Sequence, residues 1–153
     1  MLHRSDRRFV HALSRKERSI FRTTESCPYL VRLFIDLLKK VGEKHHFFAI
    51  YCFMPEHLHL IFLGCHENTH LLQALEGFKQ ATGYFLAAKH YSETKWEKSF
   101  HDRILRSKEL GAHLRYVLDN PVRRGLVGNW REYQFSGAIG LDLEALLENL
   151  ATE

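Results

Sequence analysis

The chain has no hydrophobic run long enough to span a membrane, and it has only three cysteines among its 153 residues. A membrane-spanning helix needs about 20 apolar residues, and the first residues lack the apolar core of a signal peptide. The cysteines are odd in number and form no CxxC pair, which indicates reduced thiols rather than a disulfide framework. These absences predict a cytoplasmic protein with no membrane anchor.

Lysine and arginine are also absent from residues 132–153, which hold five acidic side chains. Basic residues concentrate instead in residues 1–22 and 102–131, with seven in each segment. Two basic segments beside an acidic end suggest a surface that binds a polyanion. The residues predicted to contact it are Arg15, Lys16, Arg103, Arg123 and Arg124. The alternative is a solvated basic protein with no such partner.

The spacing of apolar residues predicts alternating strands and helices. Strands are expected at residues 8–13, 47–53, 57–63 and 99–106. Helices are expected at residues 27–41, ending at Gly42, then after a cap at Asn68, and from a cap at Ser107 through Asp119, before Pro121. This order is typical of a single α+β, ferredoxin-like domain over residues 1–153, with helices packed on a mainly antiparallel sheet. Residues 139–153 are expected to form an acidic C-terminal helix or tail.

Two histidines lie two residues apart in the apolar segment 51–62. Side chains alternate between the faces of a strand, so His57 and His59 should point the same way, about 7 Å apart along the backbone. Two neutral imidazoles on one face are suited to bind a divalent metal ion. The alternative is a pair of core histidines that only form hydrogen bonds within the protein.

The expected helix from Ser107 carries a second set of polar residues. Tyr116 and Asn120 lie one turn apart, on the flank of the apolar stripe that packs on the sheet. Both could reach a metal ion held there. Tyrosine attacks only when its proton is lost or its target is strongly polarised, because its ordinary pKa is near 10, and a metal ion can supply that polarisation. The alternative is a surface aromatic residue and a helix-end amide.

Together these segments resemble the HUH single-tyrosine transposases. The His-hydrophobic-His motif of that family is similar to residues 54–60 (MPEHLHL). The tyrosine-helix signature of its branch of REP-associated tyrosine transposases is similar to residues 116–127 (YVLDNPVRRGLV). Residues 130–136 (WREYQFS) resemble the segment on the C-terminal side of that signature in the same branch. The resemblance covers roughly residues 8–138.

The resemblance implies a nuclease and strand transferase that acts on single-stranded DNA with hairpin, repetitive palindromic elements, as a monomer or homodimer. It implies that His57, His59 and Asn120 bind Mg²⁺ or Mn²⁺ and that Tyr116 is the nucleophile, forming a 5′-phosphotyrosine intermediate. Two other functions stay open. One is a metal-dependent phosphodiesterase in which water attacks, and the other is a noncatalytic single-stranded nucleic-acid-binding protein.

Several neighbours of these residues are further candidates. Glu56 precedes His57 directly and is either a partner of the metal site or a solvated turn carboxylate. His113 shares the helix flank of Tyr116 and is a candidate for orienting the phenol. The tyrosines that compete for the role of nucleophile are Tyr84, Tyr91 and Tyr133.

Overall fold

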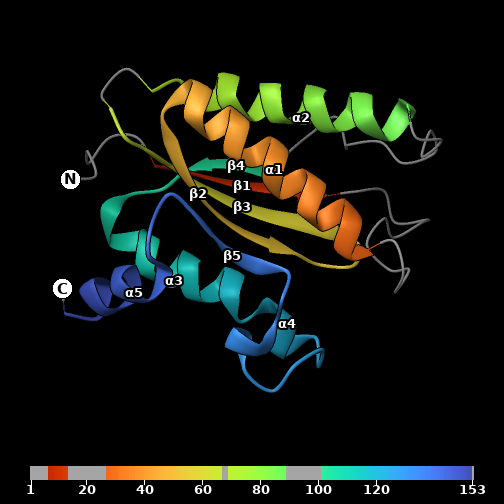
Figure 1. Ribbon diagram of the computed structural model, residues 1–153. Helices are drawn as coiled ribbons and strands as arrows, with labels where there is room; N and C mark the ends of the chain where they lie inside the picture. The colour runs from red at the N-terminus through yellow and green to blue at the C-terminus, as the bar shows by residue number, and fades with distance from the viewer. Residues whose placement is uncertain (1–6, 14–26, 67–68, 89–100, 153) are drawn as a thin grey trace.

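A five-stranded antiparallel sheet lies between two layers of helices in the computed structural model, which describes residues 7–13, 27–66, 69–88 and 101–152 (Figure 1). The elements in chain order are β1 (Arg7–Leu13), α1 (Cys27–His45), β2 (Phe47–Phe53), β3 (His57–Gly64), α2 (Leu71–Ala88), β4 (His101–Ile104), α3 (Ser107–Leu118), α4 (Asn120–Arg123), the 3₁₀ turn η1 (Trp130–Glu132), β5 (Ser136–Ile139) and α5 (Leu143–Ala151). No helix in the described ranges is long and apolar enough to cross a lipid bilayer.

The strand order in the sheet is β4-β1-β3-β2-β5, and every neighbouring pair is antiparallel. The first six elements follow the β-α-β-β-α-β order of ferredoxin-like domains. The predicted α+β, ferredoxin-like fold is therefore confirmed. Strand β5 extends the sheet beside β2, and the sequence pattern did not predict it.

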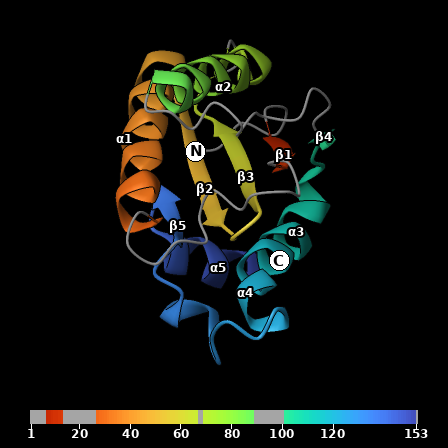
Figure 2. The same ribbon diagram turned by 90° about the vertical axis from the view of Figure 1, so that its right-hand side faces the viewer.

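Alternation along β3 gives each face of the sheet its own core. Leu58, Leu60 and Phe62 belong to the apolar cluster under α1 and α2. Ile61 and Leu63 belong to a second cluster, formed with α3 and the C-terminal elements. Figures 1 and 2 show α1 and α2 together on one side of the sheet, with α3 and α5 on the other. Because β3 is central and buried on both faces, its sequence is an almost continuous apolar run.

Two predicted helix ends are wrong. Helix α1 does not stop at Gly42 but continues to His45, because His46 adopts the positive φ of 56° that often follows a helix. A side chain at position 42 would bring its Cβ within 3.1 Å of the Phe47 carbonyl oxygen, so the glycine is explained by close packing instead. Helix α3 ends at Leu118, and Pro121 lies inside the following turn, α4.

The cap of α3 lies one residue earlier than predicted. It is Arg106 rather than Ser107, and its backbone N–H donates to the Glu109 carboxylate at 2.9 Å. Asn68, the predicted cap of the preceding helix, lies outside the described residues. The strand predicted at residues 99–106 is described as β4, His101–Ile104.

The chain after α4 returns to the sheet at the end of β2. The Tyr133 hydroxyl donates to the Phe53 carbonyl at 2.5 Å. The Phe53 N–H donates to the Phe135 carbonyl at 2.9 Å, and β5 then pairs with β2 from Ser136 to Ile139. This returning segment therefore fixes the end of β2, directly before the turn that leads into β3.

Candidate active site

The first two site residues lie at the beginning of β3. A tight turn after β2 is closed by the Met54 N–H, which donates to the His57 carbonyl at 2.8 Å. The strand then points His57 and His59 to the α3 side of the sheet, and their Nε2 atoms lie 2.8 Å apart. One imidazole must donate this hydrogen bond and the other accept it. His59 is buried, whereas His57 is partly exposed.

Asn120 reaches this pair from the break between α3 and α4. The first helix ends at Leu118, and Asn120 begins the second, with Pro121 at a first-turn position where its missing N–H is tolerated. The Asn120 amide nitrogen contacts the Nε2 atom of His59, and the side chain is buried. Asn120 thus lies buried against the sheet at the first residue of α4.

The three side chains fit a small divalent cation. Two ligands at right angles in an octahedral site, each about 2.1 Å from the ion, lie about 3 Å apart, and the two imidazole nitrogens are 2.8 Å apart. A half-turn of the Asn120 amide presents its oxygen, the atom type that Mg²⁺ and Mn²⁺ prefer. No group of three or more His, Cys, Asp or Glu in the described ranges could hold a metal ion. Asn120 supplies a further polar side chain in contact with the pair.

Tyr116 lies one helical turn before Asn120, beside the buried histidine. Its ring meets the His59 ring edge to face, with centroids 6.1 Å apart and planes at 89°. The tyrosine is 47% exposed, so a large molecule can reach it. Tyr116 lies in the last turn of α3, and Asn120 begins α4 after the break between the two helices. The chain thus places a phenol next to the polar cluster and in contact with solvent.

The competing tyrosines are placed differently. Tyr84 is 79% exposed but lies on α2, which packs on the opposite face of the sheet. Tyr133 is buried, and its hydroxyl is engaged with the Phe53 carbonyl. Tyr91 lies outside the described residues. Among the tyrosines whose side chains are described, Tyr116 is the one that contacts a histidine of the pair.

Of the five residues predicted to contact DNA, the structure describes the side chains of two, Arg123 and Arg124. Arg123 and Arg124 lie at the end of α4, next to Tyr116 and to the turn before β3 respectively. Arg15 and Lys16 lie outside the described residues. The backbone of Arg103 lies in β4, opposite Phe9 of β1, and its side chain is outside the described part of the structure.

Two contacts of the arginine pair were not predicted. The Arg123 guanidinium lies over the Tyr116 ring, 4.1 Å from its centroid, and Nη2 donates to the Tyr116 carbonyl at 3.2 Å. The spacing of seven residues, about two helical turns, is the signal that could have indicated this contact. Arg124 donates to the Glu56 carboxylate at 2.9 Å. Glu56 and Arg124 are 68 positions apart, so no local pattern indicates that they meet.

The comparison with solved structures identifies the fold. The chain is similar to a REP-associated tyrosine transposase bound to a REP hairpin, with a TM-score of 0.68 and 22% sequence identity, over 89% of this chain and 78% of that one. The chain has the fold of that transposase. No protein-family model and no curated protein matches the sequence. At this identity, the likeness to the transposase is one of fold, and the site rests on the geometry described above.

Further histidines lie on α3 or on strands of the same sheet. His113 donates from Nδ1 to the Glu109 carbonyl at 3.0 Å, one turn back on its own helix. In the register of this transposase-like sheet, His11 of β1 lies opposite His59, and His101 of β4 lies opposite His11. Cys52 of β2 also lies opposite His59, and burial raises the pKa of its thiol to about 12. Cys52 is therefore a protonated core thiol at neutral pH.

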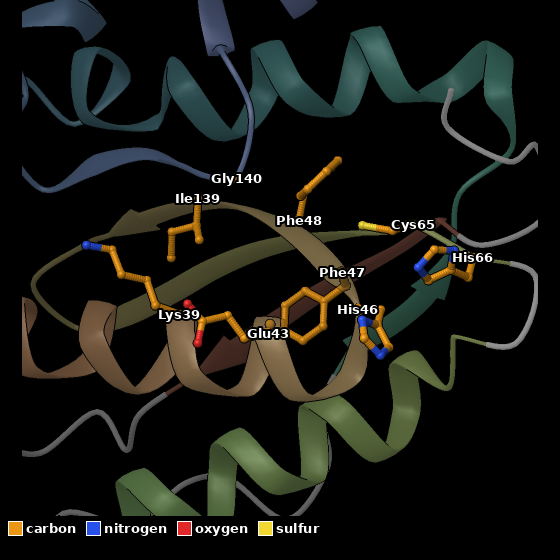
Figure 3. A pocket seen from close by; sticks show the side chains of 10 residues that line it. Lys39, Glu43, His46, Phe47, Phe48, Cys65, His66, Ile139 and Gly140 are labelled. Carbon is orange, nitrogen blue, oxygen red and sulfur yellow. The ribbon is translucent and has the colours of Figure 1, made fainter.

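A separate cavity of about 440 Å³ lies at the other end of the sheet. Its lining includes Lys39 and Glu43 of α1, His46, Cys65 and Gly140 (Figure 3). Because β3 runs from His57 to Gly64, this cavity lies one strand length from the paired histidines. None of the residues predicted to act in catalysis or metal binding lines it.

Proposed function

We propose that the chain is a metal-dependent endonuclease and strand transferase for single-stranded DNA, related to the REP-associated branch of the HUH single-tyrosine transposases. One observation supports this most directly. An exposed tyrosine, Tyr116, lies against a cluster of two imidazoles and an amide that fits a divalent cation. The shared fold adds support, because the solved transposase is bound to a REP hairpin.

In this proposal His57, His59 and Asn120 hold Mg²⁺ or Mn²⁺. The ion, when bound, would polarise a non-bridging oxygen of the scissile phosphate. Both histidines bind it as neutral imidazoles through Nε2, the atoms that point toward each other. Because Asn120 is neutral, the site carries less negative charge than one with a carboxylate. A phosphodiester therefore approaches more easily, at the expense of metal affinity.

Tyr116 is the proposed nucleophile. Its Oη forms a bond to phosphorus while the bond from phosphorus to the 3′ oxygen breaks, with attacking and leaving oxygens in line. The phenolic proton passes to water, and the leaving 3′ oxygen takes up a proton from water on its own side of the phosphate. The products are a 5′-phosphotyrosyl enzyme and a free 3′-hydroxyl, which together conserve the phosphodiester bond energy for rejoining.

The proposed substrate is single-stranded DNA next to a hairpin, as repetitive palindromic elements provide. Two exposed arginines are placed to meet the DNA backbone: Arg123, over the tyrosine ring, and Arg124, beside the turn before β3. The active form is a monomer or homodimer, and we place it in the cytoplasm, where reduced cysteines and chromosomal DNA occur together.

A denaturing gel tests the proposal. The protein is incubated with Mg²⁺ and a library of hairpin-flanked single strands, each labelled at the 5′ end in one sample and at the 3′ end in the other. We expect a shortened 5′-labelled strand and a 3′-labelled strand that migrates with the protein, because the enzyme keeps the 5′ phosphate. The Tyr116→Phe variant should bind the DNA and form neither product.

The other outcomes contradict the proposal in distinct ways. Cleavage without any protein-linked strand would indicate attack by water and a phosphodiesterase. Binding without cleavage in any divalent metal would indicate a noncatalytic binding protein. A linkage to Tyr84, Tyr91 or Tyr133, found by mass spectrometry, would move the nucleophile.

A further inference from the structure

The side chain of Tyr116 is held from two sides by residues of different elements. Its ring meets the His59 ring of β3 edge to face, with centroids 6.1 Å apart. Its face is covered by the guanidinium of Arg123, from the end of α4, at 4.1 Å from the ring centroid. The same guanidinium donates to the Tyr116 carbonyl at 3.2 Å. Arg123 therefore contacts both the ring and the backbone of one residue.

These contacts restrict a side chain that would otherwise be mobile. An exposed tyrosine on a helix can change rotamer, and each change moves its hydroxyl by several ångströms relative to the polar cluster. A planar guanidinium stacks on an aromatic face and donates from its edge at the same time, whereas an ammonium cannot do both. Cation–π attraction of this kind is modest at an exposed site, so its importance lies in geometry rather than in stability.

We infer that Arg123 is a positioning residue for the nucleophile, and that its flat guanidinium keeps the Tyr116 hydroxyl directed at the scissile phosphate. This role is distinct from a contact with the DNA backbone, which any cation could make. It rests on the proposed function, in which Tyr116 attacks the phosphate. Displacement of a reacting atom by about 1 Å can cost about 100-fold in rate, so a loss of this stack should appear in the chemical step.

The structure supplies a matched control for the test. Arg131 also covers an aromatic ring, that of Trp130, with its guanidinium 4.5 Å from the ring centroid. The arginine of this second stack is exposed, and it is tied to Glu144 of α5 rather than to the site. Replacement of either arginine by lysine keeps the charge and removes the planar group. The two variants therefore carry the same substitution at two different aromatic stacks, one at the candidate site and one away from it.

The experiment compares Arg123→Lys, Arg131→Lys and the wild type under single-turnover conditions with a cleavable hairpin strand and Mg²⁺. We expect Arg123→Lys to retain the Kd for DNA within about 3-fold, since the charge is kept. Its rate of adduct formation at saturating DNA should fall by about 10- to 100-fold. Arg131→Lys should change neither quantity.

Chemical rescue separates positioning from general damage. Methylguanidinium ion added to Arg123→Ala should restore part of the lost rate, because the ion can occupy the same face of the ring. An equal concentration of NaCl should restore nothing. In the free protein, the NMR signal of the labelled Tyr116 ring, assigned by its absence in Tyr116→Phe, should move in Arg123→Lys and stay in place in Arg131→Lys.

The inference is overturned if Arg123→Lys forms the adduct at the wild-type rate, if its whole defect lies in Kd, or if the ring signal is unchanged. These failures leave the proposed function intact, because the wild type still forms an adduct that Tyr116→Phe does not. If the wild type forms no adduct, both the proposed function and the inference are wrong.

Discussion

The two faces of the sheet differ in what they bury. On the α1 and α2 face, aromatic residues pack on one another, with Phe34 at 6.2 Å from both Phe53 and Phe78 between ring centroids. On the α3 face the apolar cluster ends in two buried polar residues, His59 and Asn120. The α3 face therefore combines apolar packing with the polar cluster on which the proposed function depends.

Physical chemistry explains why the second face tolerates its polar residues. A buried polar group without a partner costs free energy, commonly about 1–3 kcal/mol by mutational data. His59 contacts both His57 and Asn120. These contacts join the polar side chains to one another at the start of β3, and the rest of that face remains apolar. The contrast between the faces can be tested by substitutions on each.

The largest effect is expected at the histidine pair. The double substitution His57→Ala and His59→Ala removes two of the three proposed ligands, so cleavage of hairpin DNA should be abolished. Binding should persist, because contacts to the DNA backbone dominate affinity. Cleavage on a denaturing gel and Kd by titration measure the two effects. Undiminished cleavage by this variant, or by the wild type in excess EDTA, would remove the metal ion from the proposal.

On the opposite face, Phe78→Ala should show the reverse pattern. The side chain is fully buried beneath Phe34, so its loss should lower the free energy of unfolding by about 3–5 kcal/mol. Cleavage per folded molecule should stay near the wild-type level at low temperature. Denaturant unfolding and single-turnover cleavage check this. A stable variant with impaired cleavage would show that the α2 face also shapes the site.

A smaller effect is expected from Asn120→Asp. A carboxylate binds Mg²⁺ more strongly than an amide does, so the Mg²⁺ concentration that gives half-maximal cleavage should fall. The rate at saturating metal should fall as well, since added negative charge opposes the phosphodiester. Metal titrations of cleavage measure both. Asn129→Asp is the matched control, because Asn129 only caps the η1 turn. An unchanged metal requirement in Asn120→Asp would argue against Asn120 as a ligand.

The smallest effect is expected for the ion pair between Glu56 and Arg124. Both side chains are substantially exposed, at 37% and 48%, so water screens the attraction. A double-mutant cycle with Glu56→Gln and Arg124→Gln should give a coupling free energy of about 0.2–1 kcal/mol in unfolding experiments. A coupling free energy well above this range would mean that the ion pair helps to hold α4 against the sheet.

Much of the fold was predictable because its signals are local. Alternation in β3 assigned Leu58, Leu60 and Phe62 to one face and the histidines to the other, and helical spacing identified the stripe of α3 that packs on the sheet. Strand β5 escaped prediction because its four residues are only partly buried and carry no apolar run. Its place depends on backbone pairing with β2, which sequence patterns do not record.

The candidate site also contains some features that sequence patterns indicate and others that they do not. The histidine pair and the four-residue spacing of Tyr116 and Asn120 could be read from the sequence, since each follows the period of one element. The break between α3 and α4 could not be read from the sequence. Asn120, after the break, is buried, whereas Tyr116, before it, is exposed. The contact between Glu56 and Arg124 joins distant segments, so only the folded chain reveals it.

The hydrogen bond from Tyr133 to the Phe53 carbonyl ties the candidate site to a segment that follows it in the chain. All of the proposed catalytic and metal-binding residues precede residue 121, so a fragment ending soon after α4 would still contain them. That fragment would lack the two bonds that anchor the end of β2, and with them β5 along its edge. Transplanting the site into another protein therefore requires the chain through Ile139, including residues outside the proposed site.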